Sequence, residues 1–319
     1  MPPTKIVKIC QAKQDISDIL KEAVKNSDLK GKNRIFIKPN LSHPEYLPGV
    51  VTDPYLTYLL VSLLRNNAQE VIVGESDGFN YPCRVAFQKT GMEAAVKKAG
   101  GTIINLSEDQ IIKVKFPESN TPIKHLFLPK TILDADARID LPLMKTHEFM
   151  LYSGAIKNLF GCIPSNRRIY LHPYLPAVFF YLYQLFKPQL TIMDARTGIE
   201  GNGPTKGKPV KLNLIITGTD ALAVDIVSTQ VMGLKWKETY LNYIAKKTSF
   251  QEEDIQIQGP QISEVKREFE LPRIDLPVKA QMEIYKHEYL TKFFFCSLDV
   301  VKLFQKVTLA YRGKTVQFV

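Results

Sequence analysis

Four apolar segments of this chain each run into polar or charged side chains that could serve a ligand. The segments are RIFI, EVIV, ARIDLPLM and QLTIM. The residues that follow them are Lys38 and Asn40, Glu75 and Asp77, Lys145 and His147, and Asp194 and Arg196. Cationic groups bind carboxylate or phosphate, carboxylates hold cations, and an imidazole can carry a proton. Their recurrence after apolar segments predicts one composite site.

His147 is the candidate for proton chemistry. An unperturbed imidazole titrates near about pH 6.5, so it can give or take a proton at neutral pH or, when neutral, ligate a metal. Lys157 and Asn158 follow closely in the chain. We predict that His147 and Lys157 are catalytic, with Glu75 and Asp77 orienting the histidine. The alternative is a structural histidine with a satisfied hydrogen bond.

The remaining polar residues are predicted to bind the ligand. A lysine directly after an apolar strand is poorly placed for a solvated surface, which favours a bound anion. Glu75 and Asp77 could instead hold a divalent cation, cap a helix or hold a lysine, and Asp194 is the candidate metal ligand. The predicted ligand-binding residues are Lys38, Asn40, Lys145, Asn158, Arg196, Glu200 and Asn202.

The segment RTGIEGNGPTKGKP, which contains Arg196, Glu200 and Asn202, is expected to be a loop. Its glycines would let the backbone approach a ligand closely, and Lys206 and Lys208 add positive charge. The loop could therefore cradle a phosphate or carboxylate, although it matches neither the Walker A pattern nor the dinucleotide-binding glycine pattern. An ordinary surface loop is the alternative.

Strand-like and helix-like segments alternate along most of the chain and must position these residues. The pattern predicts strands at 5–10, 34–40, 70–76 and 101–106, and helices at 15–26, 51–68 and 84–100, the last with a break near Gly91. Asp53 and Pro54 are typical of a helix start. A hairpin is expected at 111–128, and the strand–helix alternation resumes after 189. This order predicts an α/β fold with a mostly parallel sheet covered by helices, whose ligands bind at the carboxyl ends of the strands.

The segments divide into two lobes and an extension. We expect an α/β body at 1–187, a second α/β lobe at 188–270 packed on it, and a basic amphipathic C-terminal extension at 271–319. In the extension, apolar residues at helical spacing could dock on the body or contact a membrane surface peripherally. These residues are Phe293, Cys296, Val300, Leu303 and Val307.

Composition narrows the classes of protein. The net charge of +10 suggests an anionic partner or simple solubility, and no sequence motif supports nucleic-acid binding. The four cysteines lack any paired spacing, so we expect that this chain alone holds no iron–sulfur cluster. The N-terminal residues show no signal-peptide pattern, which favours a cytoplasmic location. The longest uncharged apolar stretch, 174–186, is shorter than the roughly 20 residues that span a bilayer.

Several motifs together resemble the uncharacterised family known as domain of unknown function 362 (DUF362). They are IKPNL, VTDP, VGESDG, LPLMKTH, SGAIKNLFGCIP, GIEGNGP and TDALAVDIVSTQVMG, and they cover about residues 32–234. Some members of that family carry an appended iron–sulfur domain. Because this chain lacks the run of cysteines that such a domain needs, any electron-transfer role that the resemblance implies would need a separate redox partner protein.

The sequence is also distantly similar to nickel-pincer lactate racemases. The similarity lies in the strand, histidine, glycine and lysine arrangement that contains His147 and Lys157. It implies an acid/base role for His147 and an anchor for a nickel-pincer-like nucleotide, or for an anion, at Lys157. His43, His125, His172 and His287 lie in unrelated sequence contexts.

Two functions remain open from the sequence. The first is an enzyme, of isomerase or racemase type or associated with an oxidoreductase, that acts on a small anionic substrate or cofactor by His147-assisted acid/base chemistry. The second is a non-catalytic module that binds a metal or cofactor for an iron–sulfur redox partner. The substrate, the metal and the oligomeric state are not determined by the sequence.

Overall fold

Apolar strands and amphipathic helices alternate in the computed structural model, which describes residues 4–13, 15–78, 81–118, 120–164 and 168–295 and the single residues 300, 303, 306 and 307. The strands are β1 (Lys5–Gln11), β2 (Arg34–Lys38), β3 (Glu70–Glu75), β4 (Thr102–Asn105), β5 (Ile111–Lys115), β6 (His125–Pro129), β7 (Ala137–Asp140), β8 (Leu143–His147), β9 (Leu151–Ser153), β10 (Leu190–Glu200), β11 (Lys208–Gly218) and β12 (Ile255–Gln258).

The helices begin largely where the sequence predicts. They are α1 (Ile16–Lys25), α2 (Pro54–Arg65), α3 (Cys83–Lys89), α4 (Met92–Lys98), α5 (Lys130–Leu133), α6 (Ala155–Asn158), α8 (Leu175–Phe186), α9 (Ala221–Val231), α10 (Leu241–Thr248), α11 (Ile262–Val265), α12 (Leu276–Lys286) and α13 (Glu288–Phe295). The 3₁₀ segments are η1 (Leu159–Cys162), η2 (Ile169–Tyr174), η3 (Trp236–Glu238) and η4 (Glu252–Asp254). The Asp53 side chain accepts a hydrogen bond from the Tyr55 amide at 2.8 Å, so it caps α2 as expected. Gly91, at φ 79°, separates α3 from α4.

One large sheet runs through the molecule in the order β12-β1-β11-β10-β7-β2-β3-β4. The pairs on either side of β2, and those of β10 with β7 and β8, are parallel, whereas β11 is antiparallel to both of its neighbours. The predicted mostly parallel α/β fold is therefore confirmed. Because β10 joins β7 to β11, strands from both predicted lobes share this sheet, and the boundaries at 187 and 270 stay a prediction.

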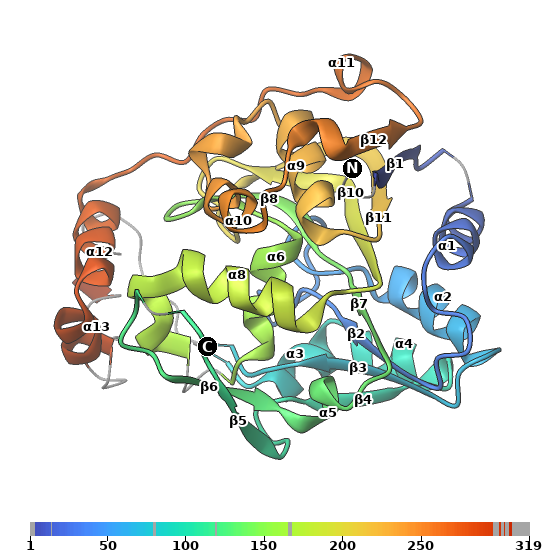
Figure 1. Ribbon diagram of the computed structural model, residues 1–319, viewed down its shortest axis with the longest axis horizontal. Coiled ribbons are helices and arrows are strands. Elements are labelled where there is room, and N and C mark those ends of the chain that lie inside the picture. The colour runs from blue at the N-terminus through green and yellow to red at the C-terminus, as the bar shows by residue number, and fades with distance from the viewer. Residues whose placement is uncertain are drawn as a thin grey trace.

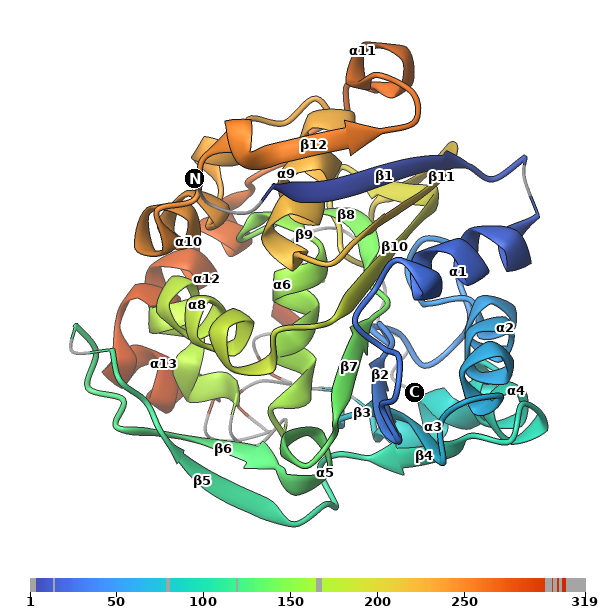
Figure 2. The ribbon, with the colours of Figure 1, turned by 45° about the vertical axis from the view of Figure 1, so that its right-hand side comes forward.

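Helices cover both faces of this sheet (Figures 1 and 2). Buried side chains of α6, α8, α9 and α10 form the core on one face, and those of α1, α2, α3 and α4 form the core on the other. The predicted hairpin is confirmed as the antiparallel pair β5–β6, whose apolar side chains pack with α8 in a third cluster.

The glycine-rich segment is a hairpin rather than a long loop. β10 continues to Glu200, which pairs with Lys208 at the start of β11. Ile199 is buried here, so its side chain favours strand pairing over an open loop. Only residues 201–207 remain outside the two strands.

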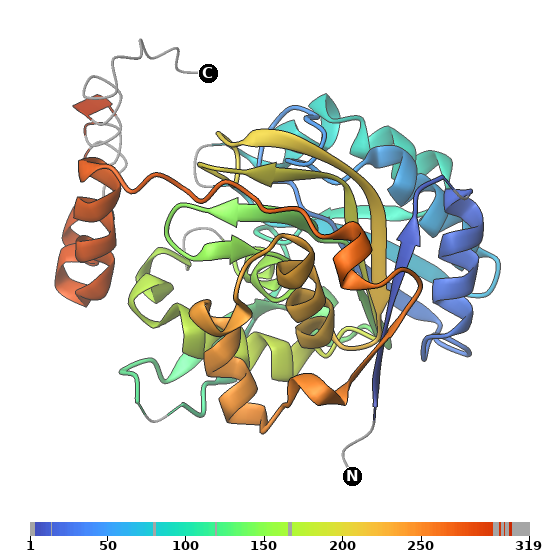
Figure 3. The same cartoon turned by 90° about the horizontal axis from the view of Figure 1, so that it is seen from above.

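The C-terminal extension docks on the body through one side of α12 and α13. Val278, Ile284 and Thr291 are buried, and the Tyr174 hydroxyl donates a hydrogen bond to the Glu288 carboxylate at 3.0 Å. Figure 3 shows the two helices, in red, beside the body at the end of an extended segment. Cys296, part of the predicted apolar stripe, lies outside the described residues. Within the described chain, no helix is long and apolar enough to cross a membrane.

Candidate functional site

The four strands that end in polar residues are neighbours in the sheet. β10, β7, β2 and β3 lie side by side, and β8 continues along β10 beyond β7. Their carboxyl ends therefore meet at one edge. The sequence predicted this convergence, on the condition that the strands were neighbours.

Lys38 and Glu75, at the ends of β2 and β3, form a buried ion pair. Their charged atoms lie 2.5 Å apart, and the amine also donates to the Pro39 carbonyl at 2.6 Å. A Cβ on Gly161 would lie 2.7 Å from a Glu75 carboxylate oxygen and 3.0 Å from the Lys38 amine, so only glycine fits against the pair. Glu75 thus holds a lysine, which is one of the roles the sequence left open.

The amine of Lys145 forms hydrogen bonds with three oxygen atoms of the protein. Its amine donates to the Asn40 side-chain carbonyl at 2.8 Å, to the Ser42 hydroxyl at 3.0 Å and to the Val50 carbonyl at 2.6 Å. Burial and the charge of Lys157 lower the pKa of Lys145. The acceptors nevertheless occupy all three N–H bonds of an ammonium group, so the geometry keeps the side chain protonated.

The two predicted amide residues connect this lysine to the next strand. Asn40 donates to the Asn158 side-chain oxygen at 2.9 Å, and Asn158 donates to the Asp140 carboxylate at 2.7 Å. Burial is the main cause that raises the pKa of Asp140 well above its usual range. Its second oxygen is buried without a hydrogen bond to any described residue. The two amide side chains therefore connect Lys145 to Asp140 through a chain of hydrogen bonds.

His147 ends β8 as a buried, neutral imidazole. Its Nδ1 accepts hydrogen bonds from the amides of Phe149 at 3.1 Å and Met150 at 3.3 Å. Burial lowers the pKa of His147 well below its ordinary value, and the charges of Lys157 and His172, in that order, lower it further. Because Nδ1 is the acceptor, the ring proton lies on Nε2. His147 therefore presents an N–H donor on the side away from this turn.

Lys157, one turn into α6, differs from the other lysines of the site. Its amine makes no hydrogen bond or ion pair with any described residue. Burial, and then the charge of Arg168, lower the pKa of Lys157 to about 8. A substantial fraction of this amine is therefore neutral near physiological pH, so it can accept a proton.

Two of the predicted acidic residues are engaged elsewhere. Asp77 accepts hydrogen bonds from the Cys83 amide at 2.8 Å and the Asn105 side chain at 3.0 Å. Its carboxylate therefore binds the first backbone amide of α3. Asp194 uses both carboxylate oxygens to bind the Arg196 guanidinium, at 2.9 and 2.7 Å. Arg196 also donates to Asp53 at 2.8 Å. These contacts fasten β10 to the start of α2.

Glu200 and Asn202 bind the segment that leads to α12. The Glu200 carboxylate accepts from the Glu270 amide at 3.0 Å, and the Asn202 carbonyl accepts from the Arg273 amide at 2.9 Å. A Cβ on Gly203 would lie 2.1 Å from the backbone oxygen of Thr146. The glycine is thus required by strand packing, and no ligand is needed to explain it.

Three other groups around the site were not assigned a role from the sequence. Asp225, in α9, accepts hydrogen bonds from the Ala155 and Ile156 amides, at 2.6 and 2.9 Å, and so caps α6. Burial raises the pKa of Asp225 to about 7. His172 lies near enough to His147 to affect its pKa, although its sequence context is unrelated. Asp140 is also buried, close enough to Lys38, Asp225 and Glu75 for their charges to shift its pKa.

The described residues do not supply a protein-built metal centre. No group of three or more His, Cys, Asp or Glu side chains in that part of the chain could hold a metal ion. Of the residues that could hold a nickel-pincer-like nucleotide, this site supplies one histidine, His147, and one lysine, Lys157. This set is incomplete for a metal held by the protein alone.

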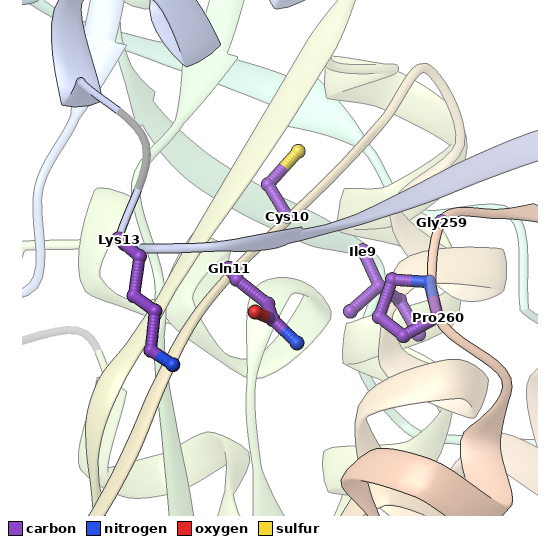
Figure 4. Close-up of a pocket in the computed structure, with 6 residues that line it drawn as sticks. All are labelled: Ile9, Cys10, Gln11, Lys13, Gly259 and Pro260. Carbon is purple, nitrogen blue, oxygen red and sulfur yellow. The ribbon is translucent and has the colours of Figure 1, made fainter.

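A hollow of about 300 Å³ lies apart from these residues, beside the end of β1 and the residues that follow β12 (Figure 4). Its walls are formed by Ile9, Cys10, Gln11, Lys13, Gly259 and Pro260. Figure 4 shows Cys10 on the opposite side of β1 from Ile9 and Gln11, as strand alternation requires. None of these residues belongs to the predicted site.

The segment that contains these residues matches a known protein family. The family described as domain of unknown function DUF362 matches residues 35–230, which is more than half of the chain. The chain belongs to this family, and the prediction from its motifs is confirmed.

The chain is also similar to a curated protein. A thylakoid-associated protein of Synechocystis sp. is 26% identical over 215 residues, which are 65% of each chain. The chain therefore spans just under two thirds of this curated relative.

Solved structures similar to the chain include the following two. The lactate racemase apoprotein from Thermoanaerobacterium thermosaccharolyticum has 17% identity and a TM-score of 0.45, over 69% of this chain and 55% of that one. A protein from Thermotoga maritima has 12% identity and a TM-score of 0.40, over 77% of this chain and 60% of that one. Neither carries a residue role to this chain.

Proposed function

We propose that this chain is an enzyme that binds a small carboxylate or phosphate compound and removes a proton from it. Lys157 accepts the proton, and the Nε2–H group of His147 donates a hydrogen bond to the oxygen on which negative charge develops. The supporting observation is the contrast between Lys157, whose amine has no protein partner among the described residues and a pKa of about 8, and the neighbouring lysines. Lys38 is ion-paired with Glu75, and Lys145 donates to three protein oxygens.

The charges around His147 favour an anionic ligand. The groups that shift its pKa, besides burial, are Lys157, His172 and Lys145, and all of them lower it. Arg168 adds a further positive charge near Lys157. An anion bound among these groups would offset their mutual repulsion and raise the pKa of each base.

The proton transfer has a simple balance of bonds. In a carbon acid, the C–H bond next to the carboxylate breaks, an N–H bond forms on Lys157, and the electron pair moves onto a carboxylate oxygen. A neutral imidazole N–H can stabilise that oxygen without giving up its own proton. His147 is held in the required tautomer by its two backbone hydrogen bonds.

Deuterium exchange tests this function directly. The full chain is incubated in D₂O with a panel of 2-hydroxy and 2-amino acids, and loss of the proton next to the carboxylate is followed by NMR. We expect exchange for at least one compound, and a loss of about 10²- to 10⁴-fold in Lys157→Met. Lys157→Arg should be equally inactive because a guanidinium cannot accept a proton.

Variants of the histidine separate a donor from a base. His147→Gln retains an N–H donor and should keep more activity than His147→Ala. Equal inactivation of the two variants would contradict the donor role, and exchange that survives Lys157→Met would contradict the whole proposal. So would the absence of exchange with every compound. Circular dichroism of each variant checks that the fold is intact.

The cellular setting is part of the proposal. Cys10, Cys83 and Cys162 are buried free thiols, which agrees with a reducing cytoplasmic location. An iron–sulfur redox partner, suggested by the family resemblance, is not favoured by any specific contact in the described residues.

A further inference from the structure

We propose that the outward face of α13 binds an anionic lipid surface. On this helix Tyr289 is 87% exposed, Phe293 is 68% exposed and Leu290 is 40% exposed. Tyr289 and Phe293 are four residues apart, so they lie on the same side of the helix. The opposite side contains Thr291, which is fully buried.

Exposed apolar side chains concentrate in this part of the molecule. Among the described residues, eight of the thirteen large hydrophobic residues with high exposure come after residue 270. Beyond α13, Leu303 and Val307 are 61% and 60% exposed and are again four residues apart. Such a concentration marks an interaction surface more strongly than scattered apolar residues do.

The body holds α13 with this face outward. The Thr291 hydroxyl donates to the Ile284 carbonyl at 2.9 Å, which packs α13 against α12. The Tyr174 hydroxyl binds Glu288 at the first turn of α13. Since these contacts use the inner side, Tyr289 and Phe293 are presented in a fixed orientation.

Charge distinguishes a lipid surface from a protein partner. Residues 271–319 contain eight Lys and Arg against four Asp and Glu. Lys286 precedes the exposed Tyr289 by three residues and pairs with Glu283, and Lys292 precedes the exposed Phe293 and pairs with Glu288. Lysine is depleted at protein–protein interfaces. Aromatic side chains flanked by lysines are typical of helices that lie in the headgroup region of an anionic membrane. Because no described helix can span a bilayer, the expected contact is peripheral.

Vesicle flotation with the full chain tests this proposal. The probes are phosphatidylcholine vesicles with and without phosphatidylglycerol, at low and high salt. We expect binding to the anionic vesicles that weakens with salt. The double variant Tyr289→Ser/Phe293→Ser should reduce the partition coefficient about tenfold or more, because burial of each aromatic ring is lost. Tyr55→Ser, at a position on α2 that is 58% exposed, is the matched control and should bind normally.

Three results would overturn the proposal. They are equal binding of the double variant and the unchanged chain, equal binding to both kinds of vesicle, and no binding to either. Size-exclusion chromatography of the same proteins identifies the main competing occupant, a second copy of the chain. Self-association that is lost in the double variant, without vesicle binding, would assign this face to a dimer instead.

Discussion

The ring of Tyr285, in α12, stacks on the imidazole of His172, in η2, with ring centroids 4.3 Å apart and an angle of 21° between the planes. The same tyrosine ring contacts Phe149 edge-on at 5.7 Å. Phe149 donates its amide to His147. One aromatic residue of the C-terminal extension therefore joins the two segments that surround the proposed base and donor.

Replacement of Tyr285 with Leu should loosen the extension. The stacked and edge-on ring contacts are expected to stabilise docking by about 1 kcal/mol beyond the apolar area buried. Hydrogen exchange of residues 276–295, measured by mass spectrometry, should therefore become faster. Tyr289→Leu, at a position that is 87% exposed, should leave the exchange unchanged. Equal exchange in Tyr285→Leu and the unchanged chain would show that the stack does not hold α12.

Lys157 should make stability depend on pH in a specific direction. Its pKa falls from 10.5 in the unfolded chain to about 8 in the fold, so the unfolded state binds more protons between these values. The free energy of unfolding that this group controls therefore rises as the pH increases from about 8 to 10.5, and its full penalty is present below pH 8.

Lys157→Met tests this dependence. The variant should be more stable than the unchanged chain at pH 7, by up to about 3 kcal/mol, and the difference should shrink towards pH 10.5. Urea unfolding at both pH values measures it. Inorganic phosphate should narrow the gap at pH 7 by binding the ammonium form. A difference that is independent of pH would mean that the amine titrates normally in the fold.

Asp225 should control the position of α6, the helix that contains Lys157. Its carboxylate accepts two backbone amides at the helix start and the Tyr152 hydroxyl at 2.8 Å. Asp225→Asn replaces one acceptor oxygen with a donor, so one of these bonds is lost. We expect a loss of about 1–3 kcal/mol at pH 8.

The loss in Asp225→Asn should be larger at acidic pH than at pH 8. The pKa of Asp225 is raised from 3.8 to about 7, so the stability associated with this group is fully present below pH 3.8 and declines as the pH rises through 7. Asparagine does not titrate, so the variant lacks this decline. Denaturant unfolding at pH 5 and pH 8 gives the comparison, and Asp220→Asn, which alters the cap of α9, is the control. Parallel pH dependences in the unchanged chain and Asp225→Asn would exclude this role.

The fold was predictable because its signals are local. Asp53 and Pro54 mark the start of α2, the first by its capping side chain and the second by its fixed φ, and Gly91 interrupts a helical pattern because it adopts a positive φ. The edge of the sheet that gathers polar residues was also predictable, since each strand ends directly before them. The order of the strands was not, because it depends on pairing between distant segments.

The partners of the site residues depend on contacts that leave no local pattern. Asp225 is 70 residues away from the amide it caps at Ala155. His172 approaches His147 through η2, in a sequence context that shows no relation to it. The sequence does not distinguish a glycine that makes room for a ligand from one such as Gly203, at which an added Cβ would clash with the Thr146 backbone. The spacing of the residues therefore identified candidate lysines, but it did not distinguish Lys157 from Lys38 and Lys145, which bind protein groups.

Gly161→Ala should disrupt the buried pair of Lys38 and Glu75. An added Cβ would lie 2.7 Å from the Glu75 carboxylate, and the carboxylate cannot retreat easily because it also accepts the Ser76 amide at 3.0 Å. We expect a loss of about 1–3 kcal/mol, as for other overpacked cores, measured by thermal and urea unfolding. Gly91→Ala is the comparison, because a Cβ there meets nothing within 4 Å and only its φ of 79° is unfavourable. If Gly161→Ala costs no more than Gly91→Ala, the glycine is not needed to fit against the pair.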